Sequence, residues 1–252
     1  MQNKNFKISF KRKYSISDLK KYLQAQRDKI EKNLHLQCKI LIIDDVINET
    51  DYLFKDDIVW LKNQKNCNIT TKTDLENLAD AGGYDIIISD NEGVGIHLGG
   101  QTGNGILLIN QLKKEYPDKI YVLFSSKQTN FRQIKRLKAN EIWDKTELLQ
   151  NSRENREGGF ADKVQEMMKY FANPSKRWED VRTQLLNSGT SIHSVAKLES
   201  AYVKSIINKQ PEIYSKTYDK TDVTNDKNID VSDLIKSGKS FINTTISLLS
   251  LI

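Results

Sequence analysis

Hydrophobic and polar residues follow two different periods along most of the chain. Apolar runs such as KILIID, YDIIIS and KIYVLFSS are typical of strands buried on both faces of a sheet. Between these runs, apolar residues recur at the spacing of one helix face. The pattern predicts strands over 39–44, 67–71, 84–89, 119–126 and 141–144, and helices over 51–63, 72–83, 105–116, 129–140 and 160–171.

Regular alternation of strands and helices predicts a parallel sheet covered by helices on both faces, with right-handed crossovers. Five such units favour an α/β, flavodoxin-like doubly wound fold with the strand order 2-1-3-4-5. In folds of this type, ligands bind outside the carboxyl ends of the strands, near the point where the strand order reverses. Chemistry is therefore expected at the strand ends.

The flanking segments have a different character. Residues 1–37 are a basic extension, with a short strand over 6–13 and a helix that Ser15 or Ser17 can cap. The α/β domain is predicted over 38–172, with a polar insertion, ELLQNSRENREGG, before its last helix. A helical region follows over 173–252, with helices at 177–189 and 190–209, a polar linker at 210–230 and an apolar end that packs on the body or on a partner.

Charge and composition narrow the function only slightly. The chain has 252 residues and a formal net charge of +6, and its first 37 residues carry ten Lys or Arg against three Asp or Glu. Such an arm attracts nucleic acid or an acidic partner, although a solvated helix face is the simpler interpretation. Apolar runs are too short for a membrane span and the N-terminus does not resemble a secretion signal, so we expect a cytoplasmic protein.

Reactive side chains gather at the predicted strand ends. Asp44 and Asp45 end the first strand, Asp90 the third and Ser125 the fourth, and Lys145 follows the fifth. Crowded carboxylates repel one another, so either one carboxyl has a raised pKa or a cation joins them. Carboxylate oxygens together with waters suit Mg²⁺. With an aspartate nucleophile, a hydroxyl and an ammonium, this set favours phosphoryl transfer to Asp90.

In this order and on these elements, the five residues resemble those of the receiver domain of bacterial response regulators, over about residues 38–172. The resemblance implies that Asp44, Asp45 and Asp90 bind Mg²⁺ and that Asp90 accepts the phosphoryl group. It also implies that Ser125 and Lys145 contact that group, and that Glu92 lends a backbone carbonyl to the metal. A histidine kinase or phosphotransfer protein would be the donor, and the C-terminal helices would contact a protein partner.

Several positions depart from the receiver pattern. Thr146 stands where receivers have a proline after the lysine, and Ile142 stands where they have an aromatic switch residue. Asn104-Gly105 replaces the usual Asp-Gly, and the loop after Asp90 is longer and richer in glycine. An alternative is therefore a pseudo-receiver, which keeps the fold as an interaction scaffold without being phosphorylated.

Three further hypotheses remain open. The segment SDNEGVGI followed by GGQTGNGILL also resembles the glycine boxes of histidine-kinase-type ATPases, although the two boxes lie too close together to enclose a lid. A second hypothesis is that the polar residues at the strand ends have no catalytic or metal-binding role, since such residues often end strands. Residues 189–206 weakly resemble a helix-turn-helix, but no basic cluster starts the helix, so DNA is not the favoured partner. Beyond self-phosphorylation and its reversal, the sequence leaves enzymatic activity undecided.

Overall fold

The computed structural model describes residues 13–63, 67–98, 104–126, 140–154, 157–221, 223 and 231–250. The strand predicted over 6–13 and the helix predicted over 129–140 lie outside these ranges, except for one end residue of each. No helix within the described ranges has both the length and the apolar character needed to cross a bilayer.

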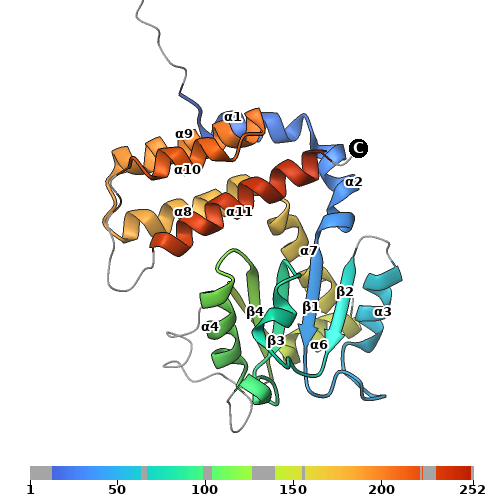
Figure 1. Ribbon diagram of the computed structural model, residues 1–252. Helices are drawn as coiled ribbons and strands as arrows, with labels where there is room; N and C mark the ends of the chain where they lie inside the picture. The colour runs from blue at the N-terminus through green and yellow to red at the C-terminus, as the bar shows by residue number, and fades with distance from the viewer. Residues whose placement is uncertain are drawn as a thin grey trace, which may run out of the picture.

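Five parallel strands form the sheet of the described chain (Figure 1). Their spatial order is β2-β1-β3-β4-β5, which confirms the predicted doubly wound fold. β1 pairs with β2 and β3, and β4 pairs with β3 and β5. The strands are β1 (Lys39–Ile43), β2 (Asn68–Lys72), β3 (Ile86–Asp90), β4 (Ile120–Ser125) and β5 (Glu141–Asp144).

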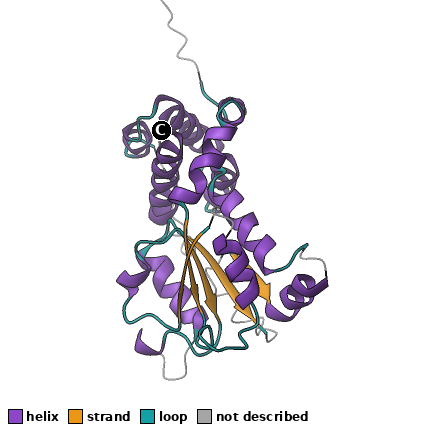
Figure 2. Cartoon of the chain, turned by 90° about the vertical axis from the view of Figure 1, so that its right-hand side faces the viewer, coloured by secondary structure: helices purple, strands orange, loops and turns teal. Residues whose placement is uncertain are grey.

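Helices cover both faces of the sheet, and Figure 2 shows the twisted strands between them. Successive strand residues face opposite sides, so Ile40 and Ile42 join one apolar cluster and Leu41 and Ile43 join another. The continuous apolar runs are explained by this burial on both faces. Within the described ranges, the helices around the sheet are α3 (Lys55–Asn63), α4 (Gly105–Glu115), α6 (Lys145–Glu154) and α7 (Phe160–Phe171).

A second group of helices lies at the amino-terminal ends of the strands, and the arrowheads of β1 and β2 point away from it (Figure 1). The N-terminal helices α1 and α2 belong to this group, since they pack against α8, α9 and α11. One continuous apolar cluster joins these helices to the sheet. The group comprises α1 (Ile16–Gln24), α2 (Arg27–Gln37), α8 (Pro174–Asn187), α9 (Ile192–Asn208), α10 (Glu212–Tyr218) and α11 (Val231–Ser250).

The predicted N-terminal helix is in fact two helices. Ser15, one of the two predicted candidates, caps α1, but the chain turns at Ala25 and Gln26 before α2 begins. α1 packs mainly on α9, whereas α2 packs on α11, where the Asn33 side chain donates a hydrogen bond to the carbonyl of Leu248 at 2.9 Å. The turn lets one segment contact both helices.

The helix predicted over 72–83 is wrong in extent. Only a short 3-10 helix, η1 (Leu78–Ala81), forms there, and Asn77 caps it. The residues before it are held as a loop because the carboxylate of Asp74 accepts hydrogen bonds from the backbone N–H groups of Leu75, Gly95 and Ile96. A side chain bonded to a distant loop competes with helix formation.

Two segments predicted as polar and irregular are partly helical. The insertion before α7 contains α6, whose first turn is capped by the carboxylate of Asp144 through the N–H groups of Thr146 and Glu147. The linker predicted over 210–230 contains α10, because Tyr214 is fully buried there against Trp178 and Tyr202. Tertiary burial of a single aromatic residue outweighs the polar composition of that segment.

Candidate functional site

The predicted site residues lie along the carboxyl edge of the sheet. Asp44 and Asp45 follow β1 directly, and Asp90 is the last residue of β3. Asp90 pairs with Phe124 across the sheet, so Ser125, the next residue of β4, lies one position beyond it. Ser125 in turn pairs with Asp144, which immediately precedes Lys145. The sheet register therefore places segments far apart in sequence at one edge.

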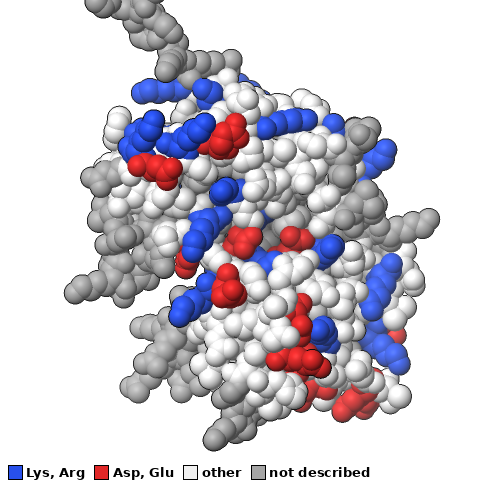
Figure 3. All heavy atoms as spheres, in the orientation of Figure 1, with Lys and Arg blue, Asp and Glu red and all other residues white. Residues whose placement is uncertain are grey.

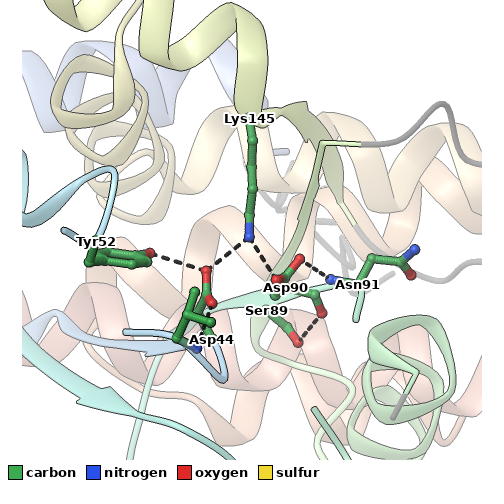
Figure 4. Close-up of polar contacts among 7 residues, drawn as sticks. Asp44, Tyr52, Ser89, Asp90, Asn91 and Lys145 are labelled. Carbon is green, nitrogen blue, oxygen red and sulfur yellow. Dashed lines mark hydrogen bonds and ion pairs between the residues drawn. The ribbon is translucent and has the colours of Figure 1, made fainter. Parts of the chain in front are cut away.

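Lys145 lies between two buried carboxylates (Figure 4). Its Nζ is 2.9 Å from Asp44 Oδ2 and 2.7 Å from Asp90 Oδ2. The Asp44 side chain is completely buried, and the side chains of Asp90 and Lys145 are each 10% exposed. The ammonium also lies over the ring of Phe124, 4.4 Å from its centroid. It therefore provides the cation expected beside the crowded carboxylates.

The three aspartates also form a possible metal site. One carboxylate oxygen from each of Asp44, Asp45 and Asp90 lies within 4.8 Å of the others, and Asp45 is exposed to solvent. The donors are all oxygen, which suits a hard cation, and one open side suits the waters that Mg²⁺ keeps. The residues present fit Mg²⁺, with Asp44 and Asp90 inside and Asp45 at the mouth.

The pKa of the Asp90 carboxyl group is shifted by its surroundings in two opposite directions. Burial raises its pKa above the usual range and the Asp44 charge adds to this, while the hydrogen bond and charge of Lys145 act in the opposite direction. The N–H of Asn91 also donates to Asp90 Oδ1 at 2.6 Å. The ammonium and the N–H both favour the ionised form, which is the form that can act as a nucleophile.

Two residues that sequence reasoning missed support this site. The Tyr52 hydroxyl donates a hydrogen bond to Asp44 Oδ2 at 3.3 Å, as Figure 4 shows. Asp74 binds the backbone of Gly95 and Ile96, which ties the loop after β2 to the loop after β3. Tyr52 lay on a predicted helix and Asp74 on another, so neither had a signal that distinguished it from a surface residue.

Two glycines bring the backbone close to the aspartates. Gly93 has a positive φ of 71°, and a Cβ there would lie 2.1 Å from an Asp45 carboxylate oxygen. A Cβ on Gly105, the first residue of α4, would lie 1.8 Å from the carbonyl oxygen of Asp90. Asn104 caps α4, and its backbone forms a bridge with Glu92, whose side chain is exposed. These two glycines therefore allow the backbone to pack closely around the aspartates. Residues 99–103 of the same loop lie outside the described ranges.

Gly105→Ala is expected to destabilise the protein by about 3 kcal/mol, since the methyl group must push α4 away from the end of β3. Chemical denaturation measures the change. Gly83→Ala is the matched control, because a Cβ there would meet no atom within 4 Å. Equal stability of the two variants would contradict the close approach of Gly105 to Asp90.

No protein-family model matches the sequence, and no curated protein matches it significantly. Solved structures do resemble the chain. One is TrrA of Thermotoga maritima in complex with Mg²⁺ and beryllofluoride, at 22% identity and TM-score 0.30, covering 43% of this chain and 86% of TrrA. Another is a Burkholderia pseudomallei regulator with a phosphorylated aspartic acid, at 20% identity and TM-score 0.32, covering 63% of this chain and 90% of the regulator.

A third is RcsB of Salmonella enterica serovar Typhimurium bound to a promoter, at 14% identity and TM-score 0.31, covering 85% of this chain and 98% of RcsB. All three are response regulators. Their likeness to this chain concerns the fold alone, and the doubly wound fold predicted from the sequence is confirmed by the strand order itself. The roles of individual residues rest on the geometry of this chain.

Proposed function

We propose that the chain is a response-regulator-like signalling protein that accepts a phosphoryl group on Asp90 in the presence of Mg²⁺. The observation that carries this proposal is the grouping of three aspartate oxygens within 4.8 Å of one another, with Lys145 bonded to two of the three carboxylates. Asp44, Asp45 and Asp90 would hold the metal, and the backbone carbonyl of Glu92 would complete the protein ligands.

The transfer uses groups that the chain itself provides. An oxygen of the ionised Asp90 carboxylate forms a bond to phosphorus, while the bond from phosphorus to the donor breaks and the donor leaves with that electron pair. Bound Mg²⁺ supplies positive charge that offsets the phosphoryl oxygens. Lys145 can then exchange its contact with Asp90 for a contact with a phosphoryl oxygen, and the Ser125 hydroxyl donates to another.

The donor would be a histidine kinase or a phosphotransfer protein, and the output would be contact of the C-terminal helices with a protein partner. This region has no basic cluster at the start of α9, where only His193 and Lys197 lie in the first two turns. DNA therefore remains the less favoured partner. A phosphorylated Asp90 adds negative charge at the loops that lead into α3 and α4, which is how such a switch begins.

The proposal is tested with the full chain, Mg²⁺ and either acetyl phosphate or beryllofluoride. We expect the intact mass to increase by one phosphoryl group with acetyl phosphate, and the melting temperature to rise with beryllofluoride. Asp90→Asn should abolish both responses, because an amide is not a nucleophile. Asp51→Asn, which removes an exposed carboxylate from the loop after β1, should keep both.

A pseudo-receiver is the second candidate, and Ile142 is the observation that favours it. This residue occupies the position of the aromatic switch and is 42% exposed on β5. Because isoleucine has no ring, it cannot change ring orientation when the Ser125 hydroxyl moves. A wild-type protein that binds Mg²⁺ but gains neither mass nor stability from the phosphoryl reagents would establish this candidate. Nucleotide binding independent of Lys145 and Ser125 would instead favour the ATPase alternative.

A further inference from the structure

A cleft of about 690 Å³ lies at the edge of the sheet opposite the aspartates. Its walls come from the amino-terminal ends of β4 and β5, from α7, and from α8 and α11 of the helical group. Figure 3 shows charged side chains of both signs gathered in the band between the helical group and the sheet. A volume of this size is typical of sites for small molecules.

The cleft is lined by a buried arginine with unused donors. Arg177 of α8 is only 2% exposed, and its guanidinium lies 3.5 Å from the centroid of the Phe241 ring. Nη1 donates to the carbonyl of Phe171 at 3.0 Å, whereas Nε is buried without a hydrogen-bond partner. Within the described residues, no carboxylate forms an ion pair with Arg177. A guanidinium has five N–H donors, and of these at least the Nε–H has no partner in the described chain.

The charge of this arginine persists at neutral pH. Burial lowers its pKa to about 10, which leaves the group protonated under physiological conditions. An ionised group inside a protein is costly unless a partner of opposite charge and hydrogen bonds compensate it. In direct contact, the described chain supplies one carbonyl and two aromatic rings, those of Phe241 and Phe171. The charges of Asp85 and Asp118 also favour the ionised form, but neither carboxylate forms an ion pair with Arg177. Within the described residues, the guanidinium therefore has no anion in direct contact with it.

The carboxylates of the cleft are engaged elsewhere. Asp180 accepts a hydrogen bond from the Tyr170 hydroxyl, and Glu141 accepts one from Trp143 Nε1 at 2.7 Å. Asp233 lies 3.5 Å from the ammonium of Lys236, its neighbour on α11. None of them neutralises Arg177 by direct contact.

The other cations of the cleft reinforce the positive character of this wall. Lys176 extends over the Tyr170 ring, 5.5 Å from its centroid, and Lys119 donates to the carbonyls of Gly82 and Tyr84. Neither lysine forms an ion pair within the described chain. Arg177 thus lies in one cleft with two lysines, Lys119 and Lys176, that form no ion pair within the described chain.

We propose that this cleft binds a small organic anion whose carboxylate or phosphate group accepts hydrogen bonds from Arg177. The apolar part of the ligand would lie against Val181, Leu234 and Phe241, which line the same cleft. Because the walls belong both to the sheet and to the helical group, such a ligand would favour one arrangement of the two. The cleft does not include Asp90, so this proposal can be tested independently of the proposed function.

The first test uses the full chain with EDTA, so that no divalent ion occupies the aspartates. Phenyl phosphate and benzoate are titrated by calorimetry at fixed ionic strength, with phenol and benzamide as neutral counterparts. We expect the anions to bind at millimolar concentrations and the neutral compounds not to bind. Tighter binding of either anion identifies the preferred headgroup. Failure of both anions to bind would overturn the proposal.

Variants then locate the binding. Arg177→Met keeps the length of the side chain and removes the charge, and it should weaken binding about 10- to 100-fold, the usual worth of hydrogen bonds to a charged group. Gln184→Trp narrows the cleft from an exposed position and leaves Arg177 in place, so it decides the matter if Arg177→Met does not fold. Arg182→Gln removes a charge from α8 outside the cleft and should bind like the wild type. Unchanged binding in the first two variants would overturn the proposal.

Discussion

Replacing Lys145 with methionine is expected to lower the free energy of unfolding by about 3–5 kcal/mol when no divalent ion is present. The ammonium is bonded to both Asp44 and Asp90, and the Asp44 side chain has no exposure to solvent. Methionine has a similar length but no charge, so two carboxylates face each other without a cation. Urea denaturation in EDTA measures the loss.

Magnesium should reverse most of this effect. An added cation beside the same carboxylates replaces the missing ammonium, and an ion at roughly 100 times its Kd stabilises a protein by about 2.7 kcal/mol. The melting temperature of Lys145→Met should therefore rise more with Mg²⁺ than that of the wild type. Lys163→Met, at a partly exposed i,i+3 pair on α7, should change stability by only about 0.5 kcal/mol. Wild-type stability of Lys145→Met in EDTA would contradict the role of Lys145 as counter-ion.

The fold was predictable because its three inner strands, β1, β3 and β4, consist mostly of buried apolar residues. Ile86, Ile87 and Ile88 are all completely buried, and only a strand covered on both faces needs such a run. The hydrophobic pattern did not predict a helix whose burial depends on only a few residues. The segment around α10 reads as a polar linker, and its helix depends on Tyr214 entering a pocket made by distant residues. The composition of residues 210–230 alone does not predict that contact.

The candidate site was predictable for a different reason. Residues at the ends of parallel strands must meet at one edge once the strand order is known, so Asp44, Asp90 and Lys145 could be brought together from the sequence. The bond of Lys145 to both carboxylates could not, because it depends on the register of β5 and on the rotamer of a long side chain. The support from Asp74 likewise depends on a loop-to-loop contact.

The predicted division into residues 1–37, 38–172 and 173–252 stays a prediction. The N-terminal helices pack on the C-terminal ones, so these two terminal segments share one group of helices. A continuous apolar cluster also runs from that group to the sheet. A substitution of Trp178 in the helical group tests whether the helices and the sheet unfold together.

Trp178→Ala is expected to destabilise the helical group by about 3–5 kcal/mol. The indole is completely buried, stacks on Tyr202 at 4.8 Å between ring centroids, and meets Tyr214 edge-on at 6.2 Å. Its Nε1 also donates to Glu199 Oε2 at 3.1 Å. Truncation leaves a large cavity between α8, α9 and α10 and removes two aromatic contacts. Trp178→Phe keeps a ring in the cavity and should lose less than half as much.

The same variant separates stability from the chemistry of the aspartates. Trp178 lies on α8 at the amino-terminal side of the sheet, whereas the aspartates lie at the carboxyl edge, so its loss should leave the Mg²⁺ affinity of the folded protein unchanged. A single unfolding transition at lower denaturant would mean that the helices and the sheet form one cooperative unit. Two transitions, with the magnesium-stabilised one unmoved, would support a separate domain over 38–172. A fall in Mg²⁺ affinity would contradict this independence and indicate that packing of the helices reaches the carboxyl edge of the sheet.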